Sequence, residues 1–579
     1  MKYIFTDFFD TIIFRRVHSY QISFQWAKAL KYKYPCLMEF SDDDLIAFLD
    51  GSRRSLYKNF EEPPYNKVLG LVWEHLPVLH SYVDKESFVN QSLAIDVAIE
   101  LGCQYPNMHL INKFREYKKM YGSKIYIVSD FYLPATVYND FLVQAGIEDL
   151  FDDVYVSESC NCTKHKGGLY DYVLKDLSVD AKDVTMFGDS KHSDVLMARQ
   201  HGIQVKHYFP LWHKIGTNIS RIRKTDFAKH IVKWKASWCY KNSLFEEYAV
   251  ILYTFNTRLD KRLQEFHASK AAFLSRGGYF PIKVFNAVSE LINNTSPVVE
   301  YCYNSRKTCF AARESKQENG DAFRYMKQYM EDFLADDGKL YIVDEGWYNH
   351  SQQAMGETFN WDIVGLYIGS RFKDKWNYPS LCHREGLLFD YKGNGDKSPY
   401  YDVLCTNCSM YEQMLTAPHG SVASYHKNEN GEIKPVLKEN ELETEIYNMY
   451  IEQMQNRMLL HIKGLSVWLL GCDVSTRTLA KIILKSSVFA NTKRCQFLND
   501  LDAHRYDNCT TGAVAADKGV KDVRINPFKL IYNPAEYLGM FCKLQRKLLR
   551  IKPLFYLYYP FAACYFGYVY FITFFIKRK

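Results

Sequence analysis

The sequence of 579 residues lacks several features that would each narrow its class. It has no long block of Lys and Arg and no repeating basic–aromatic pattern, so nucleic acid is not an expected partner. Its N-terminus lacks the charged segment followed by an apolar segment that is typical of a secretory signal. Its 15 cysteines are scattered without the spacing of a disulfide framework. We therefore expect a cytoplasmic protein with reduced thiols.

The composition is that of a globular protein, with 47% hydrophobic residues, 24% charged residues and a net charge of +7. A chain of this length exceeds one ordinary domain, so we expect two or three domains. Aromatic residues make up 16% of the chain, which suits core packing but also carbohydrate or membrane-interface surfaces. No internal repeat or low-complexity tract interrupts the sequence.

Residues 1–210 alternate between short apolar runs and amphipathic segments. The runs YIFT, KIYIVS, VTMFGD and VKHYF each end in a polar loop and are expected strands. This alternation predicts an α/β domain with a parallel sheet and helices on both faces. A long helical pattern separates the first two strands, and it predicts a cap domain from about residue 18 to 118 over the rim of the sheet.

The remainder of the chain divides into three segments. Residues 211–270 are rich in Lys, Trp and Tyr and predict a helical connector. Residues 271–530 predict a second α/β domain, in which AAFLS, VVEYC, KLYIV and WDIVGLYIGS are expected strands. Residues 531–579 form a basic and aromatic tail.

The tail contains an uncharged stretch, Leu554 to Ile576, that is followed by KRK. The stretch is long enough to span a bilayer, but its many tyrosines favour the membrane interface. We expect a helix that lies in the headgroup region at the inner face of the cytoplasmic membrane. A spanning helix and a helix packed against its own protein are the alternatives. The basic residues that would hold it to anionic lipid stand at helical spacing: Lys543, Arg546, Lys547 and Arg550.

Four loops of the first domain carry polar residues at expected strand ends, where ligands bind in parallel sheets. A carboxylate such as Asp7 can attack phosphorus, while a hydroxyl and an ammonium group can hold the phosphoryl oxygens. Several crowded carboxylates raise one another's pKa, and Mg²⁺ relieves that repulsion. The four loops are DFFDT from Asp7 to Thr11, VSD with Ser129, TKHKGG with Lys164 and Lys166, and FGDSKHSD with Asp189 and Asp194.

This order of motifs resembles the haloacid dehalogenase superfamily of hydrolases, which has a Rossmann-like sheet with a helical cap inserted after the first strand. The resemblance implies that Asp7 is the nucleophile, that Lys164 steadies it and that Ser129 binds phosphate. Lys164 is preferred to Lys166 because K-x-x-G-x-L begins there. Thr11 and Asp130 are expected to join the substrate site. The implied Mg²⁺ ligands are Asp7, the backbone carbonyl of Phe9, Asp189 and Asp194.

The first loop departs from the family pattern at Phe9. Phosphatases of the superfamily carry an aspartate there as general acid and base, and phenylalanine cannot transfer a proton. Such a loss typically lowers the rate about 10²- to 10⁴-fold. Asp10 stands one position further along, and its role stays open. Three hypotheses follow: a phosphatase or phosphotransferase with another proton donor, a protein that binds a phosphorylated ligand without efficient turnover, and a dehalogenase-like hydrolase.

The wider chain resembles a bacterial subgroup of predicted hydrolases linked to surface-polysaccharide biosynthesis. Their first motif reads D-x-F-D-T, and stretches similar to FLSRGGY, NSRK, VDEGWYNHSQQ and TAPHGS lie within about residues 265–430. This resemblance implies a place in polysaccharide synthesis but no mechanism. Because a good leaving group needs less help from a general acid, a sugar phosphate or nucleotide-sugar phosphate is the expected substrate.

Within the second domain, Arg276 and Trp347 are candidate substrate-binding residues, with the indole as a face for a sugar. Asp344 and Glu345 follow an apolar run, so they could meet a metal-bound hydroxyl, as in phosphoribosyltransferases, or only end a strand. A zinc site is a weaker hypothesis, because two of its four ligands would be adjacent in sequence. Those ligands would be Cys382, His383, Cys405 and Cys408.

Overall fold

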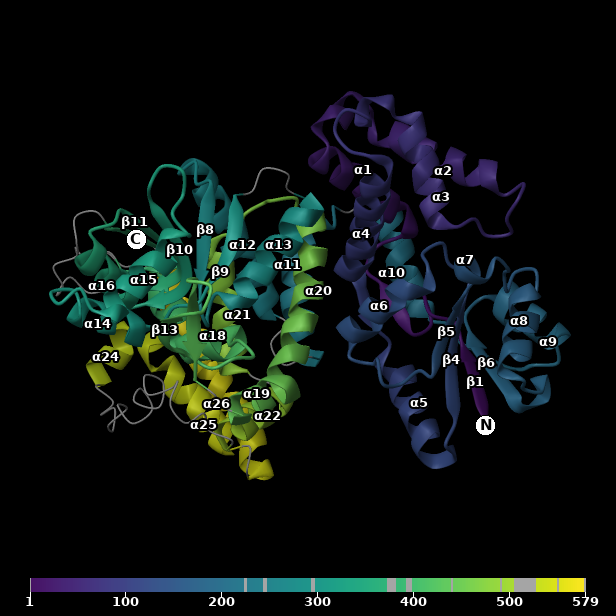
Figure 1. Ribbon diagram of the computed structural model, residues 1–579. Helices are drawn as coiled ribbons and strands as arrows, with labels where there is room; N and C mark the ends of the chain where they lie inside the picture. The colour runs from purple at the N-terminus through teal and green to yellow at the C-terminus, as the bar shows by residue number, and fades with distance from the viewer. Residues whose placement is uncertain are drawn as a thin grey trace. The chain divides into compact units, whose positions relative to one another are not determined.

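The computed structural model describes residues 2–222, 226–242, 247–292, 297–371, 382–391, 398–438, 441–489, 492–503, 527–548 and 551–576. The chain divides into two compact units (Figure 1). Unit 1 comprises Met1–Val232, Glu290–Asn294 and Lys463–Leu470. Unit 2 comprises Lys233–Ser289, Thr295–Ile462 and Gly471–Lys579. Each unit contains its own five-stranded sheet, so the predicted α/β class is confirmed for both.

The sheet of unit 1 is parallel throughout and has the order β5-β4-β1-β6-β7. The four strands predicted from apolar runs are present, and Asp153–Val156 is a fifth that the sequence analysis missed. That strand is short and begins with an acid, so it lacks the apolar run of its neighbours. The strands are β1 (Tyr3–Thr6), β4 (Lys124–Ser129), β5 (Asp153–Val156), β6 (Val184–Gly188) and β7 (Gln204–His207).

Helices cover the sheet of unit 1 and enclose a core that includes Phe5, Val128 and Met186, none of which is exposed. Phe114 of the helix before β4 packs edge-on against Phe187 of β6, with 5.1 Å between the ring centroids. These helices are α5 (Met108–Tyr121), α6 (Tyr138–Ala145), α7 (Ser157–Cys160), α8 (Gly168–Leu177), the π-helix Lys191–Met197 with α9 (Ala198–Gln200), and α10 (Leu211–Ile222).

The cap of unit 1 begins and ends at a two-stranded antiparallel ribbon, β2 (Ile13–Arg15) with β3 (Gln104–Pro106). It is therefore shorter than the predicted 18–118, because α5 belongs to the layer on the sheet. Figure 1 shows its four helices gathered beyond one end of the strands. They are α1 (Ser19–Lys33), α2 (Asp42–Leu56), α3 (Tyr65–His75) and α4 (Lys85–Cys103).

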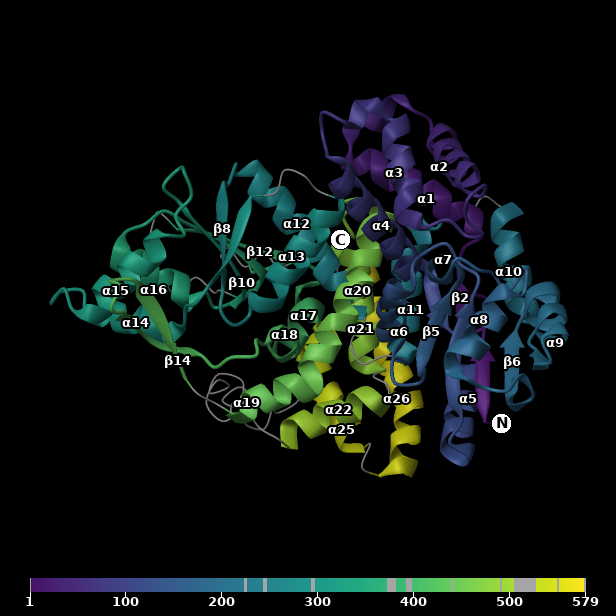
Figure 2. The ribbon, with the colours of Figure 1, turned by 45° about the vertical axis from the view of Figure 1, so that its right-hand side comes forward.

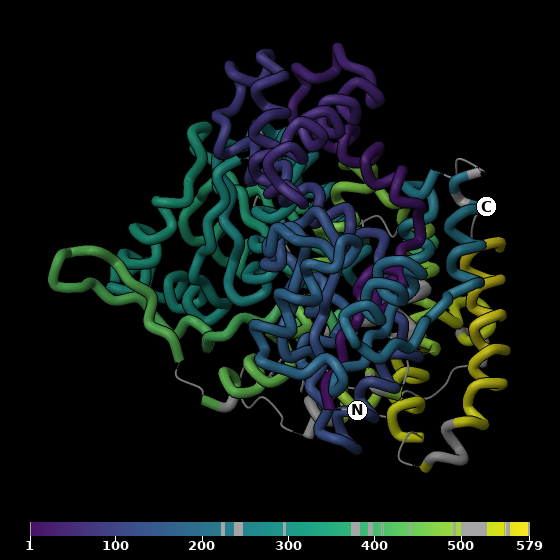
Figure 3. The backbone as a smooth tube through the Cα atoms, turned by 90° about the vertical axis from the view of Figure 1, so that its right-hand side faces the viewer, coloured from purple at the N-terminus to yellow at the C-terminus, as the bar shows by residue number. Residues whose placement is uncertain are grey.

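The sheet of unit 2 is also parallel, with the order β12-β11-β10-β8-β9 (Figure 2). The sequence analysis missed β12, whose first half is polar. A β13–β14 hairpin projects from the unit (Figure 3). The strands are β8 (Lys270–Leu274), β9 (Val298–Cys302), β10 (Leu340–Trp347), β11 (Ile363–Ser370), β12 (Cys382–Asp390), β13 (Val422–Lys427) and β14 (Ile433–Leu437).

Helices make up most of the rest of unit 2. The segment 211–270, predicted as a connector, is helical and divides between the units, with α10 in unit 1 and α12 in unit 2. The longer helices outside the tail are α11 (Ala228–Asn242), α12 (Glu247–Glu265), α13 (Tyr279–Ile292), α14 (Arg306–Glu314), α15 (Asp321–Glu331), α16 (His350–Phe359), α18 (Cys408–Leu415), α20 (Glu452–Leu469), α21 (Thr476–Val488) and α22 (Thr492–Ala503).

The tail forms α25 (Leu538–Leu548) and α26 (Lys552–Phe571), and a π-helical turn, Ile572–Ile576, continues α26. Figure 3 shows this C-terminal segment as one long helix. By length and composition alone, Tyr556–Ile576 is able to cross a membrane, and 28% of its most apolar window is buried in the protein.

The start of α2 yields a first prediction. The Ser41 hydroxyl accepts a hydrogen bond from the Asp44 amide, and the Asp44 carboxylate accepts one from the Ser41 amide, which forms a capping box. Replacing Ser41 with Ala should lower the local stability of α2 by about 0.5–2 kcal/mol. Amide hydrogen exchange along α2 measures this. Ser55→Ala, in the last turn of the same helix, is the control, and equal protection in both variants would refute the capping role.

Candidate active site

The DFFDT loop turns sharply at the carboxyl end of β1. The Asp7 amide still donates to the carbonyl of Phe187 on β6, at 2.8 Å. The carbonyl of Phe8 then accepts from the amides of Ile12 and Ile13, which closes a tight loop. Asp10 has a φ of +57°, a backbone conformation that aspartate tolerates better than most residues. This geometry holds Asp7 at the edge of the sheet.

Lys164 lies at the centre of the site. Its Nζ donates to Asp7 Oδ1 and to Asp194 Oδ1, each at 2.7 Å. The lysine side chain is 2% exposed and that of Asp194 is 1% exposed, so these charges are shielded from water. The two carboxylates raise the pKa of Lys164 above its ordinary value although burial opposes them. The ammonium therefore stays charged and holds both carboxylates in place. That Asp7 is the nucleophile and that Lys164 steadies it stay predictions.

Two contacts position the loop that carries Lys164. The Asp130 carboxylate accepts from the backbone amides of Lys164 and His165, at 2.7 and 3.0 Å. From the cap, the Glu61 carboxylate accepts from both the amide and the hydroxyl of Thr163. Each oxygen of Asp130 thus accepts a backbone hydrogen bond, so this residue positions the loop. Its predicted contact with the substrate stays a prediction. The role of Glu61 was missed, because only the fold brings the cap to this loop.

Three carboxylates meet at this edge: Asp7, Asp189 and Asp194 have oxygen atoms within 4.8 Å of one another. Burial raises the pKa of Asp7 against the opposing charge of Lys164, and the charge of Asp194 raises it further. Asp194 also accepts from the Ser190 amide at 3.0 Å. Crowded carboxylate oxygens suit a hard cation, so the residues present fit Mg²⁺, which would offset their charge and that of a phosphoryl group.

Helix α10, outside the predicted motifs, supplies two further contacts. Lys214 Nζ lies 2.5 Å from Asp189 Oδ2, and His213 Nε2 lies 2.9 Å from Asp10 Oδ1. Burial raises the pKa of Asp10, but the hydrogen bond from His213 and the charge of Arg15 lower it overall. Asp10 is thus ionised and held by α10, apart from the three clustered acids. No sequence motif marks these residues, because α10 lies close to the site only in the folded chain.

Two of the predicted substrate-binding residues, Ser129 and Thr11, belong to the second and first motif loops. Ser129 ends β4 and is 1% exposed. The Thr11 hydroxyl is buried and has no hydrogen-bond partner among the described residues. Both hydroxyls are therefore shielded from solvent, and their contact with a substrate stays a prediction.

Phe9 fills the position at which the family's phosphatases carry their general acid. Its ring is 8% exposed and packs against Phe131, with 4.3 Å between the ring centroids. The Arg15 guanidinium lies over the same ring at 3.8 Å from its centroid, and Glu100 binds that guanidinium through two hydrogen bonds of 2.8 Å. An aromatic ring and a paired cation thus occupy the place of a proton donor.

The predicted residues of unit 2 gather where the strand order reverses, between β8 and β10. Ligands bind at such reversal points in other open parallel sheets. Arg276 Nη1 donates to the buried Glu443 at 2.7 Å, after β8. Asp344 and Glu345, at the end of β10, are partly buried, and burial raises the pKa of each. The loops after β8 and β10 meet here, but the role of these acids stays open.

Trp347 requires a correction. Its indole is 8% exposed and stacks on Phe389, with 5.8 Å between the ring centroids, while its Nε1 donates to Glu412. It is therefore part of the packing rather than an open face for a sugar. The zinc hypothesis also finds no support: among the described residues, the only group of His, Cys, Asp and Glu side chains at metal-binding distances is the one in unit 1.

Comparison with known proteins agrees with this geometry. Residues 1–202 match the family model described as haloacid dehalogenase-like hydrolase. No curated protein matches the chain. The solved structures that resemble it include the 2-haloacid dehalogenase of Pseudomonas syringae pv. tomato DC3000, at 16% identity, covering 36% of this chain and 86% of that one, with a TM-score of 0.29.

Two further solved structures have TM-scores of 0.25. The haloacid dehalogenase-type phosphatase of Thermococcus onnurineus is 20% identical, and the match covers 35% of this chain and 85% of that one. The hydrolase YfnB of Bacillus subtilis, solved with magnesium, is 19% identical over 35% of this chain and 86% of its own. Residues 1–202 thus have an α/β fold with a parallel sheet and match the haloacid dehalogenase-like hydrolases, a class whose members are generally enzymes.

Gly188 yields a second prediction. A Cβ added there would lie 2.3 Å from the Asp194 carboxylate, so Gly188→Ala must displace this acid. We expect the variant to bind Mg²⁺ at least about tenfold more weakly, because one charged ligand moves by more than the tolerance of the site. Isothermal titration calorimetry with MgCl₂ measures the change. Gly51→Ala is the matched control, since a Cβ there meets nothing within 4 Å; equal loss in both variants would contradict the argument.

Proposed function

We propose that the protein is a Mg²⁺-dependent phosphohydrolase or phosphotransferase that acts on a phosphorylated small molecule through an aspartyl-phosphate on Asp7. The observation that carries this proposal is the ammonium of Lys164, which bridges the nucleophile Asp7 and the acid Asp194 in a buried site. Such a preorganised charge favours an anionic substrate and stabilises charge that develops on the phosphoryl oxygens.

The proposed reaction has two steps. A carboxylate oxygen of Asp7 attacks phosphorus, so that an O–P bond forms while the bond to the leaving-group oxygen breaks. Water or an acceptor hydroxyl then attacks the same phosphorus, which releases phosphate or a new phosphate ester and restores Asp7. Lys164 holds the attacking carboxylate in place throughout, and bound Mg²⁺ would add positive charge beside the phosphoryl oxygens.

The weak point of this site is the protonation of the leaving group. Phe9 has no proton to give, and Asp10 is held by His213. The first step is therefore best suited to a leaving group that departs as an anion, such as an anomeric or acyl oxygen or another phosphate. The resemblance of residues 265–430 to proteins of surface-polysaccharide synthesis supports sugar phosphates and nucleotide-sugar phosphates as the first compounds to test.

A third prediction tests this function. With Mg²⁺, the protein should release phosphate from acidic leaving groups, and the rate should fall steeply as the leaving group becomes more basic, because no acid assists it. A series of substituted phenyl phosphates alongside alkyl phosphates, followed by phosphate release, measures the dependence.

Asp7→Asn is the matched variant for that assay, because the amide keeps the shape of the side chain but is a poor nucleophile. We expect it to reduce phosphate release to the background rate. Release that survives this substitution would remove unit 1 as the catalyst, and a rate independent of the leaving group would show that a proton donor exists elsewhere.

We also propose a second role, as a protein held at an anionic membrane surface. Helix α26 supports it because one of its faces is exposed and apolar along its length. The exposed side chains recur at helical spacing: Leu557, Phe561, Tyr568, Phe571 and Phe575, each 38–69% exposed. Proteins rarely expose a continuous apolar surface without a partner.

The opposite face of α26 is packed within unit 2. Tyr565 stacks on Phe541 of α25 and donates to the carbonyl of Pro534, and Tyr558 donates to the carbonyl of Val488. A helix anchored on one face favours a position along the bilayer surface over a full span. On α25, Lys547 is exposed and Lys543 and Arg546 are partly exposed, which suits anionic headgroups.

A fourth prediction concerns this surface. The protein should co-sediment with vesicles of phosphatidylcholine and phosphatidylglycerol, and less with phosphatidylcholine alone. The double variant Phe561→Asp with Phe571→Asp should weaken binding about tenfold or more, since two aromatic side chains no longer enter the interface. Tyr82→Asp, at an equally exposed aromatic of the cap, is the control. Wild-type protein that stays in the supernatant with both vesicles would refute the role.

A further inference from the structure

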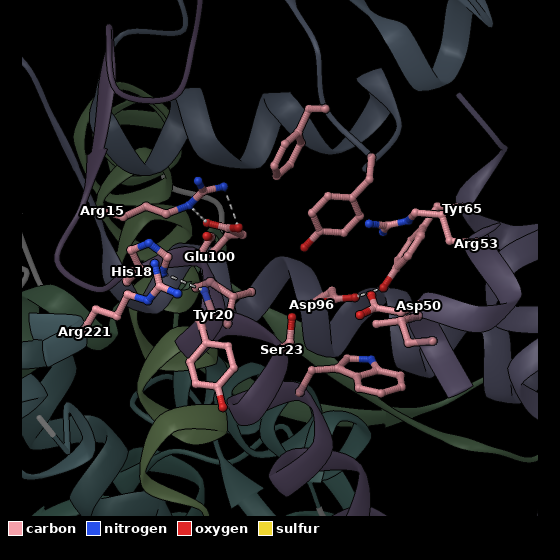
Figure 4. A pocket seen from close by; sticks show the side chains of 16 residues that line it. Arg15, His18, Tyr20, Ser23, Asp50, Arg53, Tyr65, Asp96, Glu100 and Arg221 are labelled. Atoms are coloured by element: carbon pink, nitrogen blue, oxygen red, sulfur yellow. Dashed lines mark hydrogen bonds and ion pairs between the residues drawn. The ribbon is translucent and has the colours of Figure 1, made fainter. Parts of the chain in front are cut away.

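A cavity of about 500 Å³ lies between the cap and the core of unit 1 (Figure 4). Helices α1, α2 and α4 and the start of α3 line it from the cap side, and β2 and the loop after β4 line it from the core side. Its volume falls in the range of pockets that hold small ligands, about 300–1,000 Å³. It is therefore large enough for a molecule the size of a phosphorylated hexose.

Two contacts connect this cavity to the catalytic loops. Phe131 and Tyr132, which line it, directly follow Ser129 and Asp130 at the end of β4. Arg15, which also lines it, covers the ring of Phe9, two residues from the nucleophile. The cavity therefore borders the DFFDT loop and the loop after β4, although none of the three clustered acids lines it.

Among the residues that line the cavity, Arg53 indicates most clearly what kind of ligand would bind. It comes from the last turn of α2, and its guanidinium lies over the rings of Tyr132 and Tyr65, at 4.6 and 5.7 Å from their centroids. Within the described part of the chain it forms no ion pair, in contrast to Arg15, which Glu100 satisfies through two bonds. A guanidinium that is partly buried between aromatic rings without a carboxylate partner is suited to bind an anion.

The other charges of the cavity compensate this guanidinium only in part. Asp96 accepts a hydrogen bond from the Tyr65 hydroxyl, and burial raises its pKa to about 7, so it carries less than a full charge at neutral pH. Asp50 is exposed at the rim, and Glu62 is near enough to raise the pKa of Arg53 slightly. Arg221 of α10 adds a second cation without an ion pair among the described residues, on the opposite side of the cavity in Figure 4.

We propose that the cavity is a subsite for a second anionic group of the substrate, and that Arg53 binds this group. The substrate class is then a hexose-sized phosphate ester that carries a further carboxylate or phosphate. This inference rests on the proposed function, since the phosphoryl group at Asp7 fixes the position of the remainder. The hydroxyl and carboxylate side chains around Arg53 suit the hydroxyl groups of such a compound.

A fifth prediction compares three compounds that share the same anomeric leaving-group oxygen: glucose 1-phosphate, glucuronate 1-phosphate with an added carboxylate, and glucose 1,6-bisphosphate with an added phosphate. The protein should show a kcat/KM about 10- to 100-fold higher for one or both of the doubly anionic compounds, since each gains a charge-assisted hydrogen bond. Which of the two is preferred distinguishes the carboxylate from the phosphate. Arg53→Gln should abolish the preference and leave glucose 1-phosphate within about twofold, and Arg53→Lys should restore part of it.

Arg54→Gln is the matched control, because Arg54 is the exposed neighbour on the same helix. It should preserve the preference. An equal kcat/KM for all three compounds, or an equal effect of Arg53→Gln on all three, overturns the subsite. If no compound is turned over, the proposed function fails, and calorimetric titration of the same compounds decides the subsite: tighter binding of a doubly anionic compound that Arg53→Gln removes supports it, and equal or absent binding overturns it.

Discussion

The bridge that Lys164 forms between Asp7 and Asp194 is the interaction on which the site depends. Buried carboxylates at one edge of a sheet repel one another, and leaving one of them unpaired costs several kcal/mol. The lysine offsets that repulsion while its own loop is held by Asp130 from the core and by Glu61 from the cap. The proposed nucleophile Asp7, the other acids of the cluster and the cap are thus coupled through one short loop.

In both sheets, polar side chains gather at the point where the strand order reverses, but they pack differently in the two units. Polar residues collect where the order of strands reverses, because the loops on either side of that point diverge and leave space. In unit 1 a lysine enters this space between the acids. In unit 2 the acids Asp344 and Glu345 lie instead against Gly277, where an added Cβ would come within 3.0 Å of both, and Trp347 is closed against Phe389. The shared topology therefore predicts where polar groups gather, not what they do.

The contrast between the two sheets shows which site residues could be predicted from the sequence. Apolar runs followed by acids located Asp7, Asp189 and Asp194, since every parallel strand delivers its loop to the same edge. Lys164 follows the missed strand β5 and was located by its motif alone. Residues whose roles depend on packing between distant segments could not be found in this way. Lys214 and His213 reach the site from α10, and Glu61 from the cap. Trp347 was misjudged for the same reason, because a motif does not reveal which face of a ring is covered. The strand β12 was missed because its first half is polar.

The packing around Phe9 indicates that the surrounding residues are adapted to an aromatic ring at this position. A lost catalytic residue would leave space or an unsatisfied neighbour, whereas Phe9 is tightly packed against Phe131 and covered by Arg15, which is itself paired with Glu100. The aromatic ring thus joins the catalytic loop to the wall of the cap cavity. In the proposed reaction, such a site would have to rely on the substrate for an easily expelled leaving group. Recognition of the remainder of the substrate then determines which compounds react.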